Sequence, residues 1–226
     1  EEGQSLGTPP PKGARRQGRW EDWSSGTGRV STLNGALALE SGRVRGPGGD
    51  DRGSTAATLR GNARTYGRWE ARMRARSSES GRGAYRIVAE LVPASAAPGT
   101  CTDDVITIAS ISTSTRRLGF GVSTADRRWS GTNPVGNTQY TAPAFAVEVT
   151  PSHITWFLAG RPIGTVRDRR AISDVPRTLR FRMIGSSEQQ MDQTLMVSDW
   201  QRGFPLDGGR KVTGGGALSS RSGGSC

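Results

Sequence analysis

Alternation of apolar and polar side chains between Thr65 and Thr113 is the feature that most constrains this fold. In residues 68–76 charged side chains alternate with the apolar residues Trp69, Ala71, Met73 and Ala75. Residues 85–92 and 104–111 form two further runs of this kind. A period of two predicts β-strands, because successive side chains of a strand point to opposite faces of a sheet. We expect the function to depend on what the second and third strands present to solvent.

The rest of the chain also reads as short strands joined by turns. Asn34-Gly35, between two short alternating runs, is the strongest local signal for a hairpin. Further alternating runs lie at residues 118–122, 145–150, 154–158, 179–183 and 194–200. Helical periodicity does not extend beyond one or two turns anywhere. The sequence therefore predicts an all-β protein of about a dozen strands in two stacked antiparallel sheets.

A length of 226 residues suits one all-β domain. Residues 1–18 are polar and proline-rich, which predicts a flexible linker or arm. Residues 19–204 carry the strand-like runs and form the domain. Residues 205–226 are a Gly/Ser-rich tail for which we expect little order. Residues 124–141 are predicted to be a long polar loop.

The formal charge of +11 comes almost entirely from arginine, because Lys12 and Lys211 are the only lysines among 31 basic residues. The arginines are spread along the chain, as a GC-rich coding sequence would also produce. The alternative is attraction for an anionic partner such as an acidic polysaccharide, a cell-wall polymer or nucleic acid. Nucleic acid is disfavoured by the lack of RNA-binding motifs and of a long helix. No run of about 18 apolar residues exists, so we expect no membrane span.

The two cysteines are Cys101 and Cys226. Their spacing, and the isolation of His153 in the sequence, disfavour a metal site. A disulfide that holds the C-terminal tail against the loop before residue 104 is the favoured interpretation, and two free thiols are the alternative. Such a bond fits an exported protein. Together with a first residue that is Glu and not Met, it leads us to expect a secreted bacterial protein whose leader has been removed.

The run Tyr66-Gly67-Arg68-Trp69-Glu70-Ala71-Arg72-Met73 resembles the signature strand of glycoside hydrolase family 16, which includes laminarinases, lichenases and agarases. Other segments resemble family motifs in the same order, namely residues 34–39, 146–151, 154–160 and 195–202. The resemblance covers about residues 20–204. It implies a concanavalin A-like β-jelly roll whose concave sheet holds a polysaccharide chain. Glu70 and Arg72 on the signature strand are expected to form cross-strand ion pairs.

The catalytic motif of this family, E-x-D-x-(x)-E, follows one strand after the signature. Its retaining mechanism needs two carboxylates about 5–5.5 Å apart. In the corresponding run of this chain, Asp104 could replace the first acid, Ile106 takes the middle position, and Ile108 or Ala109 takes the third. Because isoleucine can neither attack nor transfer a proton, we expect Ile106 on the groove floor and a groove without the standard site. The resemblance also aligns Glu90 with a tryptophan of the family's cleft and Pro143 with a histidine.

A rearranged acidic site is the alternative. Glu90 could work with Asp103 or Asp104, since a pair of carboxylates is the minimum for acid–base hydrolysis. Against this, Glu90 could instead pair with an arginine such as Arg86, and a neighbouring arginine disfavours a general acid.

Ligand contacts are expected from aromatic and basic side chains. Trp129, Tyr140, Trp156 and Trp200 could stack on sugar rings or belong to the core. Trp129 and Tyr140 are favoured because they lie in the predicted polar loop. Arg127 and Arg128 could contact an anionic glycan or simply be solvated. In the family, the aspartate that matches Asp199 helps to hold a structural calcium, although one oxygen ligand does not make a site; no other cofactor is implied.

Three functions remain open from the sequence. The favoured one is a secreted polysaccharide-binding protein that lacks the usual catalytic carboxylates, a pseudo-enzyme whose glycan is either neutral or anionic. The second is an active glycosidase or polysaccharide lyase with a rearranged site. The third is a protein–protein interaction or assembly module. The sequence leaves the glycan, its linkage and the oligomeric state open.

Overall fold

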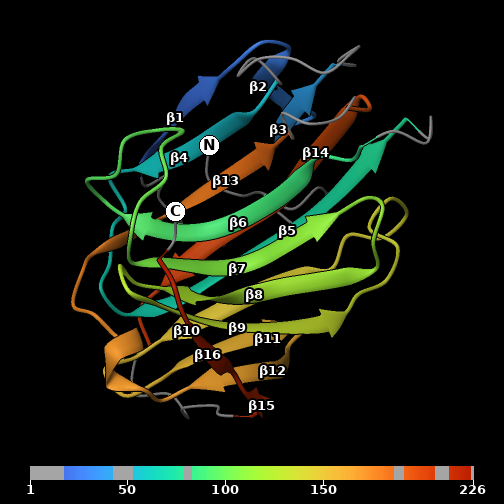
Figure 1. The fold of residues 1–226 in the computed structure, drawn as a ribbon. Coiled ribbons are helices and arrows are strands. Elements are labelled where there is room, and N and C mark those ends of the chain that lie inside the picture. The colour runs from blue at the N-terminus through green and yellow to red at the C-terminus, as the bar shows by residue number, and fades with distance from the viewer. Residues whose placement is uncertain (1–17, 43–52, 79–82, 186–190, 207–213, 225–226) are drawn as a thin grey trace, which may run out of the picture.

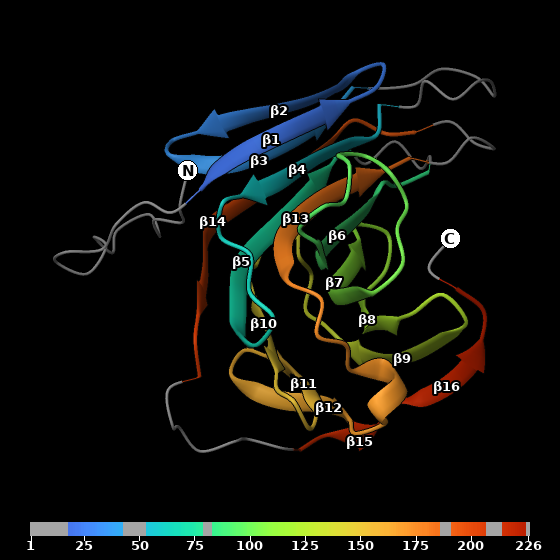
Figure 2. The ribbon, with the colours of Figure 1, turned by 90° about the vertical axis from the view of Figure 1, so that its left-hand side faces the viewer.

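The computed structural model describes residues 18–42, 53–78, 83–185, 191–206 and 214–224. Two eight-stranded sheets stack face to face (Figures 1 and 2). The sheet that we call the groove sheet has the spatial order β1 (Arg19–Ser24), β4 (Thr55–Arg60), β13 (Arg177–Ile184), β6 (Arg86–Pro93), β7 (Val105–Ser112), β8 (Arg117–Ser123), β9 (Arg127–Pro134) and β16 (Ser219–Ser222).

The second sheet, called the back sheet, has the order β15 (Gly216–Ala217), β12 (Arg161–Val166), β11 (Ile154–Leu158), β10 (Ala144–Val149), β5 (Gly67–Ser77), β14 (Thr194–Phe204), β3 (Ala36–Ser41) and β2 (Gly28–Leu33). Pairing is antiparallel except between β12 and β15. One short 3₁₀ helix, Arg169–Ala171, precedes β13. The predicted all-β sandwich of two stacked sheets is confirmed. No helix in the described part of the chain is both long and apolar enough to cross a membrane.

The main hydrophobic core lies between the two sheets. The apolar positions of β5 all contribute to it, and the charged positions of the same strand face outward, as the period of two predicts. The core's largest fully buried apolar side chains include Trp156, Tyr85, Phe145 and Phe181. Phe120 of the groove sheet meets Trp156 of the back sheet with ring centroids 5.7 Å apart, in a tilted arrangement that aromatic pairs favour.

The predicted Asn34-Gly35 hairpin is confirmed and joins β2 to β3. Both residues have left-handed backbone angles, with φ of 52° and 81°. Leu33 pairs with Ala36 directly across the turn. A two-residue turn with two positive φ values matches the twist of the strands, and this explains why Asn-Gly is favoured there.

Two predictions about loops are wrong. Residues 127–134 do not belong to a polar loop but form strand β9, which pairs with both β8 and β16. The Gly/Ser-rich tail is not without order, since residues 214–224 contain β15 and β16. The predicted linker over residues 1–18 falls outside the described residues except for Gly18.

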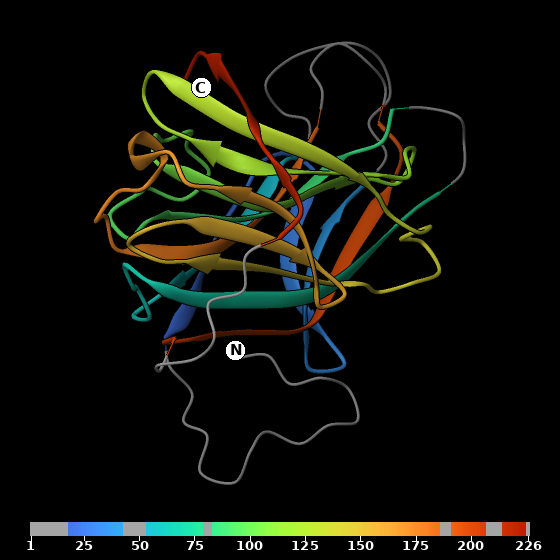
Figure 3. The same ribbon diagram turned by 90° about the horizontal axis from the view of Figure 1, so that it is seen from below.

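The C-terminal segment adds one strand to each sheet. β15 pairs with β12 at the edge of the back sheet, and β16 pairs with β9 at the edge of the groove sheet. Figure 3 shows this segment, in red, passing from one sheet to the other. Edge pairing uses backbone groups, so it needs no apolar side chains. Composition alone therefore did not reveal these strands.

Candidate binding groove

A groove with a cavity volume of about 260 Å³ lies on the outer face of the groove sheet. Strands β13, β6, β7, β8 and β9 supply most of its lining. This face is turned toward the viewer in Figure 1. The groove therefore lies on the sheet that contains β7, the strand that the sequence resemblance aligns with the family's catalytic motif.

Strand register arranges the groove side chains in two rows that cross the strands. The first row contains Arg180, Glu90, Thr107, Gly121 and Ser130. The second row contains Arg182, Val88, Ser110, Gly119 and Thr132. The arginines of these two rows thus lie on the β13 side of the groove, and their hydroxyl groups and glycines lie on the side formed by β7, β8 and β9.

A bulge in β7 determines which of its residues reach the groove. The register with β8 shifts between Thr107 and Ser110, so the two intervening residues, Ile108 and Ala109, both lie in the core. The Thr107 carbonyl accepts a hydrogen bond of 2.8 Å from Trp156 Nε1. The bulge returns Ser110 to the groove face after Thr107.

The prediction that Ile106 lies on the groove floor is wrong. Ile106 is completely buried and belongs to the core between the sheets. The strand begins at Val105, because Asp104 adopts a left-handed turn conformation with φ of 58°. The residues of β7 that line the groove are Val105, Thr107 and Ser110.

Glu90 is held in an ion pair below the groove surface. It is 4% exposed, and its Oε1 accepts a hydrogen bond of 2.7 Å from Arg180 Nε. Arg182 Nη1 lies 3.6 Å from the same oxygen. The alternative in which Glu90 pairs with an arginine is therefore the observed one, but the partner comes from β13 and is not Arg86.

Asp103 and Asp104 do not join Glu90 in the groove lining. Both belong to the turn before β7, where the Asp104 carbonyl accepts a hydrogen bond of 3.0 Å from Arg177 Nε. Among the residues that line the groove in the described ranges, Glu90 is the single carboxylate. The rearranged pair of the alternative hypothesis is thus not assembled there.

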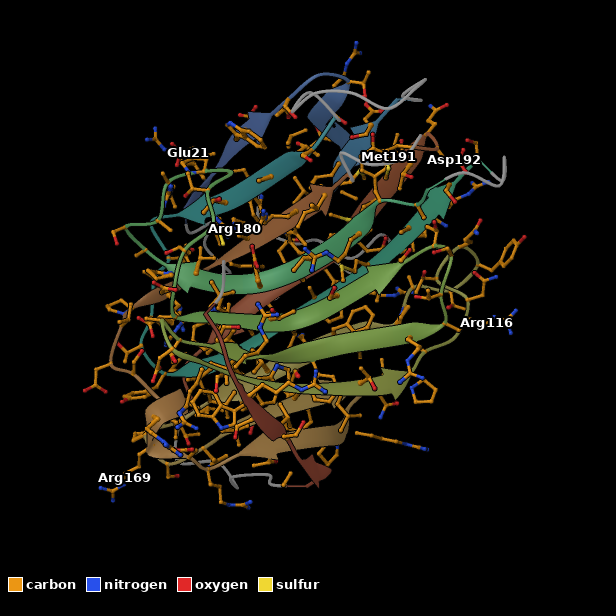
Figure 4. All side chains as sticks on the ribbon, viewed as in Figure 1. Glu21, Arg116, Arg169, Arg180, Met191 and Asp192 are labelled. Carbon is orange, nitrogen blue, oxygen red and sulfur yellow. The ribbon has the colours of Figure 1, made fainter. Side chains whose placement is uncertain are left out.

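The groove has an excess of positive charge. Arg86, Arg128, Arg180 and Arg182 line it together with the one glutamate. Arg128 donates to Ser123 Oγ and to the Gly224 carbonyl, so the C-terminal segment helps to hold it. Figure 4 labels Arg180 over the middle of the groove sheet. Such a surface attracts anions.

The pKa of Arg182 is lowered in this environment. Burial lowers the pKa of Arg182, and the positive charges of Arg180 and Arg86 lower it further, while Glu90 acts in the opposite direction. Like charges held together in a partly dry site disfavour the charged form of each.

The predicted aromatic contacts do not form an exposed platform in the groove. Trp156 is completely buried, and Trp129 is 3% exposed because β9 turns it toward the core, opposite Val122. The prediction that Trp129 stands in an exposed loop is therefore wrong. Tyr140 is 77% exposed but does not line the groove.

Three further predicted residues, Arg127, Cys101 and Asp199, are described by the structure, and a fourth, Cys226, is not. Arg127 begins β9 and is half-buried, outside the groove lining. Cys101 lines one end, whereas Cys226 falls outside the described residues. Asp199 Oδ2 lies 3.4 Å from Arg72 Nη1, on the back sheet. In the described part of the chain, no group of three or more His, Cys, Asp or Glu residues gathers as a metal site would require.

Comparison with known proteins gives a clear result for the fold. Neither the family models nor the curated proteins contain a match to this chain. Among solved structures, the laminarinase catalytic domain from Thermotoga maritima matches with a TM-score of 0.62 at 13% identity, over 92% of this chain and 100% of that one. The chain has the fold of the family 16 glycoside hydrolases.

Other family 16 folds match at similar levels. A lichenase from a mouse hindgut metagenome has a TM-score of 0.60 at 16% identity, over 83% of this chain and 93% of that one. The κ-carrageenase of Pseudoalteromonas carrageenovora has a TM-score of 0.58 at 12% identity, over 89% of this chain and 92% of that one. The jelly roll that the sequence motifs implied is thus confirmed, and what these proteins share with the chain is their fold.

Proposed function

We propose that this protein binds a polysaccharide chain in the groove and does not hydrolyse it. The observation that carries the proposal is the identity of the three groove-facing residues of β7. Val105, Thr107 and Ser110 have the spacing of the acids in E-x-D-x-x-E, and none of them is acidic. The register assumed from the sequence was one residue out, but the acids are missing in the corrected register too.

The remaining groups in the groove do not supply the missing chemistry. A retaining glycosidase needs a nucleophile and an acid on separate carboxylates. Glu90 alone is buried and ion-paired with Arg180. A Thr107 or Ser110 nucleophile would need a neighbouring base, and no imidazole or second carboxylate lines the groove within the described ranges.

Groups suited to holding a sugar chain are present. Hydroxyl groups of Thr107, Ser110, Ser130 and Thr132 line one side of the groove and can both donate and accept hydrogen bonds. Gly119 and Gly121 on β8 leave the floor between them open to a sugar ring. Binding therefore depends on polar contacts more than on aromatic stacking.

The test is electrophoresis through gels that contain laminarin, lichenan or κ-carrageenan, with a parallel assay for new reducing ends. We expect retarded migration with at least one polymer and no reducing ends. Ser110→Phe fills the groove and should abolish the retardation. Ser31→Phe, on an exposed position of β2, is the matched control and should not.

Other outcomes would favour the alternatives. Reducing-end release that Glu90→Gln abolishes would replace the proposal with an active glycosidase, and unsaturated products would indicate a lyase. A stable complex with a protein partner, without affinity for any glycan, would favour the assembly module.

The Cys101–Cys226 disulfide and export from the cell stay predictions. Gly224, two residues before Cys226, supports the pairing, because a Cβ placed on it would lie 3.7 Å from Asp103 Oδ1 in the loop that carries Cys101. Peptide mapping without reduction should recover the two cysteines in one linked peptide. Alkylation of both thiols in the unreduced, denatured protein would contradict it. The calcium expected at Asp199 also stays a prediction, although the Arg72 guanidinium beside this carboxylate does not favour a cation.

A further inference from the structure

The two sides of the groove differ in charge. Hydroxyl groups, glycines and one arginine, Arg128, lie on the side formed by β7, β8 and β9. The side formed by β13 and β6 carries three arginines and one glutamate. We call Arg86, Arg180 and Arg182 the arginine cluster.

Glu90 does not balance the charge of this cluster. Its carboxylate accepts a hydrogen bond from Arg180 Nε and lies within ion-pair distance of Arg182 Nη1. One negative charge therefore faces the two guanidinium groups of Arg180 and Arg182, and Arg86 adds a third positive charge near Arg182. Burial is the main cause of the lowered pKa of Arg182, and the charges of Arg180 and Arg86 act in the same direction.

The cluster also contains a buried donor without an acceptor. Arg180 Nε donates to Glu90 and Nη1 donates to the Thr100 carbonyl, but Nη2 has no hydrogen-bond partner among the described residues. Arg180 is 1% exposed at its side chain. Buried polar groups of proteins are nearly always hydrogen-bonded, so this orphan donor marks Arg180 as a buried charge that its protein surroundings do not fully satisfy.

The other two arginines are accessible from the groove. The Arg182 side chain is 22% exposed, and Arg86 is exposed. Guanidinium groups bind oxyanions through paired, charge-assisted hydrogen bonds, and their planar shape matches sulfate and carboxylate groups. A bound oxyanion would make direct contacts with Arg182 and Arg86 and would offset the charge of Arg180 beneath them.

We propose that the arginine cluster is a subsite for an oxyanion substituent of the polysaccharide, a sulfate ester or a carboxylate. The inference rests on the proposed function, because it assigns a substrate class to the same groove. The sugar ring that carries the anionic group lies at the β13 side, and its neighbours extend over Thr107 and Ser110. A neutral chain of the same backbone makes the hydroxyl contacts alone and binds more weakly.

The experiment compares polymers that share one backbone: laminarin, sulfated laminarin and carboxymethylated laminarin. Titration calorimetry at constant, near-physiological ionic strength gives the affinity for each. We expect the wild-type protein to bind one or both anionic forms about tenfold more tightly than the neutral form, as one or two charge-assisted hydrogen bonds would give. Whichever derivative binds more tightly identifies the group.

Arg182→Gln should remove this preference and leave the affinity for neutral laminarin within about twofold, since only charge-assisted contacts are lost. Arg74→Gln is the matched control, because Arg74 is exposed on β5 of the back sheet and carries the same charge. This control should retain the full preference for the anionic form. Circular dichroism and thermal unfolding of both variants check that they are folded.

The outcomes separate the two proposals. Binding of neither neutral nor anionic glycan overturns the proposed function. Equal binding of all three polymers, or an equal loss of affinity for all of them in Arg182→Gln, overturns the oxyanion subsite and leaves the proposed function standing. An equal loss of preference in Arg182→Gln and Arg74→Gln also overturns the subsite, because it would indicate attraction by overall charge.

Discussion

The outer face of each sheet carries a cluster of arginines and glutamates, and the two clusters differ in the ratio of the two residue types. On the back sheet, Glu70 accepts hydrogen bonds of 2.6 Å from Arg68 Nε and from Arg202 Nε, and Glu148 accepts one of 2.6 Å from Arg68 Nη1. Two carboxylates thus meet two guanidinium groups. On the groove sheet, the one carboxylate of Glu90 faces Arg180 and Arg182, and Arg86 adds a third positive charge near Arg182.

The arginines of the back sheet also have other partners. Arg68 lies over the Phe157 ring and Arg202 over the Trp200 ring, at 4.3 and 4.8 Å from the ring centroids. A balanced network of this kind needs no ligand, and we regard it as structural. The unbalanced cluster in the groove leaves positive charge that a ligand can use. The ratio of arginine to glutamate, more than the presence of arginine, distinguishes the two clusters.

Removing the carboxylate of the groove should have the largest effect on stability. Glu90→Gln leaves Arg180 buried without a counter-charge, and breaking a buried ion pair in this way costs about 3–5 kcal/mol. Denaturant unfolding followed by tryptophan fluorescence measures the loss. In the double variant Glu90→Gln/Arg180→Met part of the stability should return, because no buried charge remains. An unchanged free energy of unfolding in Glu90→Gln would contradict a structural role for Glu90 and would favour a catalytic role instead.

A substitution in the groove floor should cause the next largest loss of stability. A Cβ on Gly121 would clash with the Trp129 carbonyl on the neighbouring strand, so Gly121→Ala should separate β8 from β9 and cost about 1–3 kcal/mol. Gly119→Ala is the matched control, because its Cβ would meet only Ser110, at ordinary distances of 3.6 Å from Cβ and 3.7 Å from the carbonyl oxygen. Thermal unfolding of both variants tests this difference. Equal stabilities would show that the floor can adjust to an added methyl group.

The balanced network of the back sheet should show a smaller effect that depends on pH. Burial opposes ionisation of Glu70, but the hydrogen bonds and charges of Arg68 and Arg202 outweigh it and lower the pKa of Glu70 below 4.5. A carboxyl with a lowered pKa in the folded state stabilises the protein above its unfolded pKa, and this contribution is lost as the pH falls through the folded pKa. Arg202 is largely exposed, so solvent screens part of the contribution.

Glu70→Gln should therefore cost about 1 kcal/mol at neutral pH and nothing at low pH, where the wild-type carboxyl is protonated as well. Melting temperatures measured from neutral pH to well below 4.5 would show the two curves converging. Glu40→Gln on β3 is the control, since Glu40 forms no ion pair with any described residue. Parallel curves for wild type and Glu70→Gln would contradict the assignment.

Features encoded by neighbouring residues could be predicted from the sequence. The inward face of β5, the Asn34-Gly35 turn and the two-sheet fold follow from side-chain period and turn chemistry, which are local. The ion pairs expected for Glu70 and Arg72 are also observed, with Arg68, Arg202 and Asp199 as partners.

Features that depend on distant backbone could not be predicted in this way. Which residues of β7 face the groove depends on the turn at Asp104 and on the bulge before Ser110. The local sequence therefore predicts the wrong face for Ile106. The partner of Glu90 lies 90 positions away in sequence, on β13. Trp129 was placed in a loop because the polar residues around it hid a strand that completes the groove sheet.

The short segment that carries β15 and β16 contributes to the stability of both sheets. β15 and β16, separated only by Leu218, protect the open edges of β12 and β9 at the same time. Loss of residues 214–224 would expose two strand edges in a single event and would free Arg128 from the Gly224 carbonyl. Exposed edges pair readily with other chains. Proteolytic removal of this segment should therefore promote self-association and make Arg128 at the β9 side of the groove more mobile.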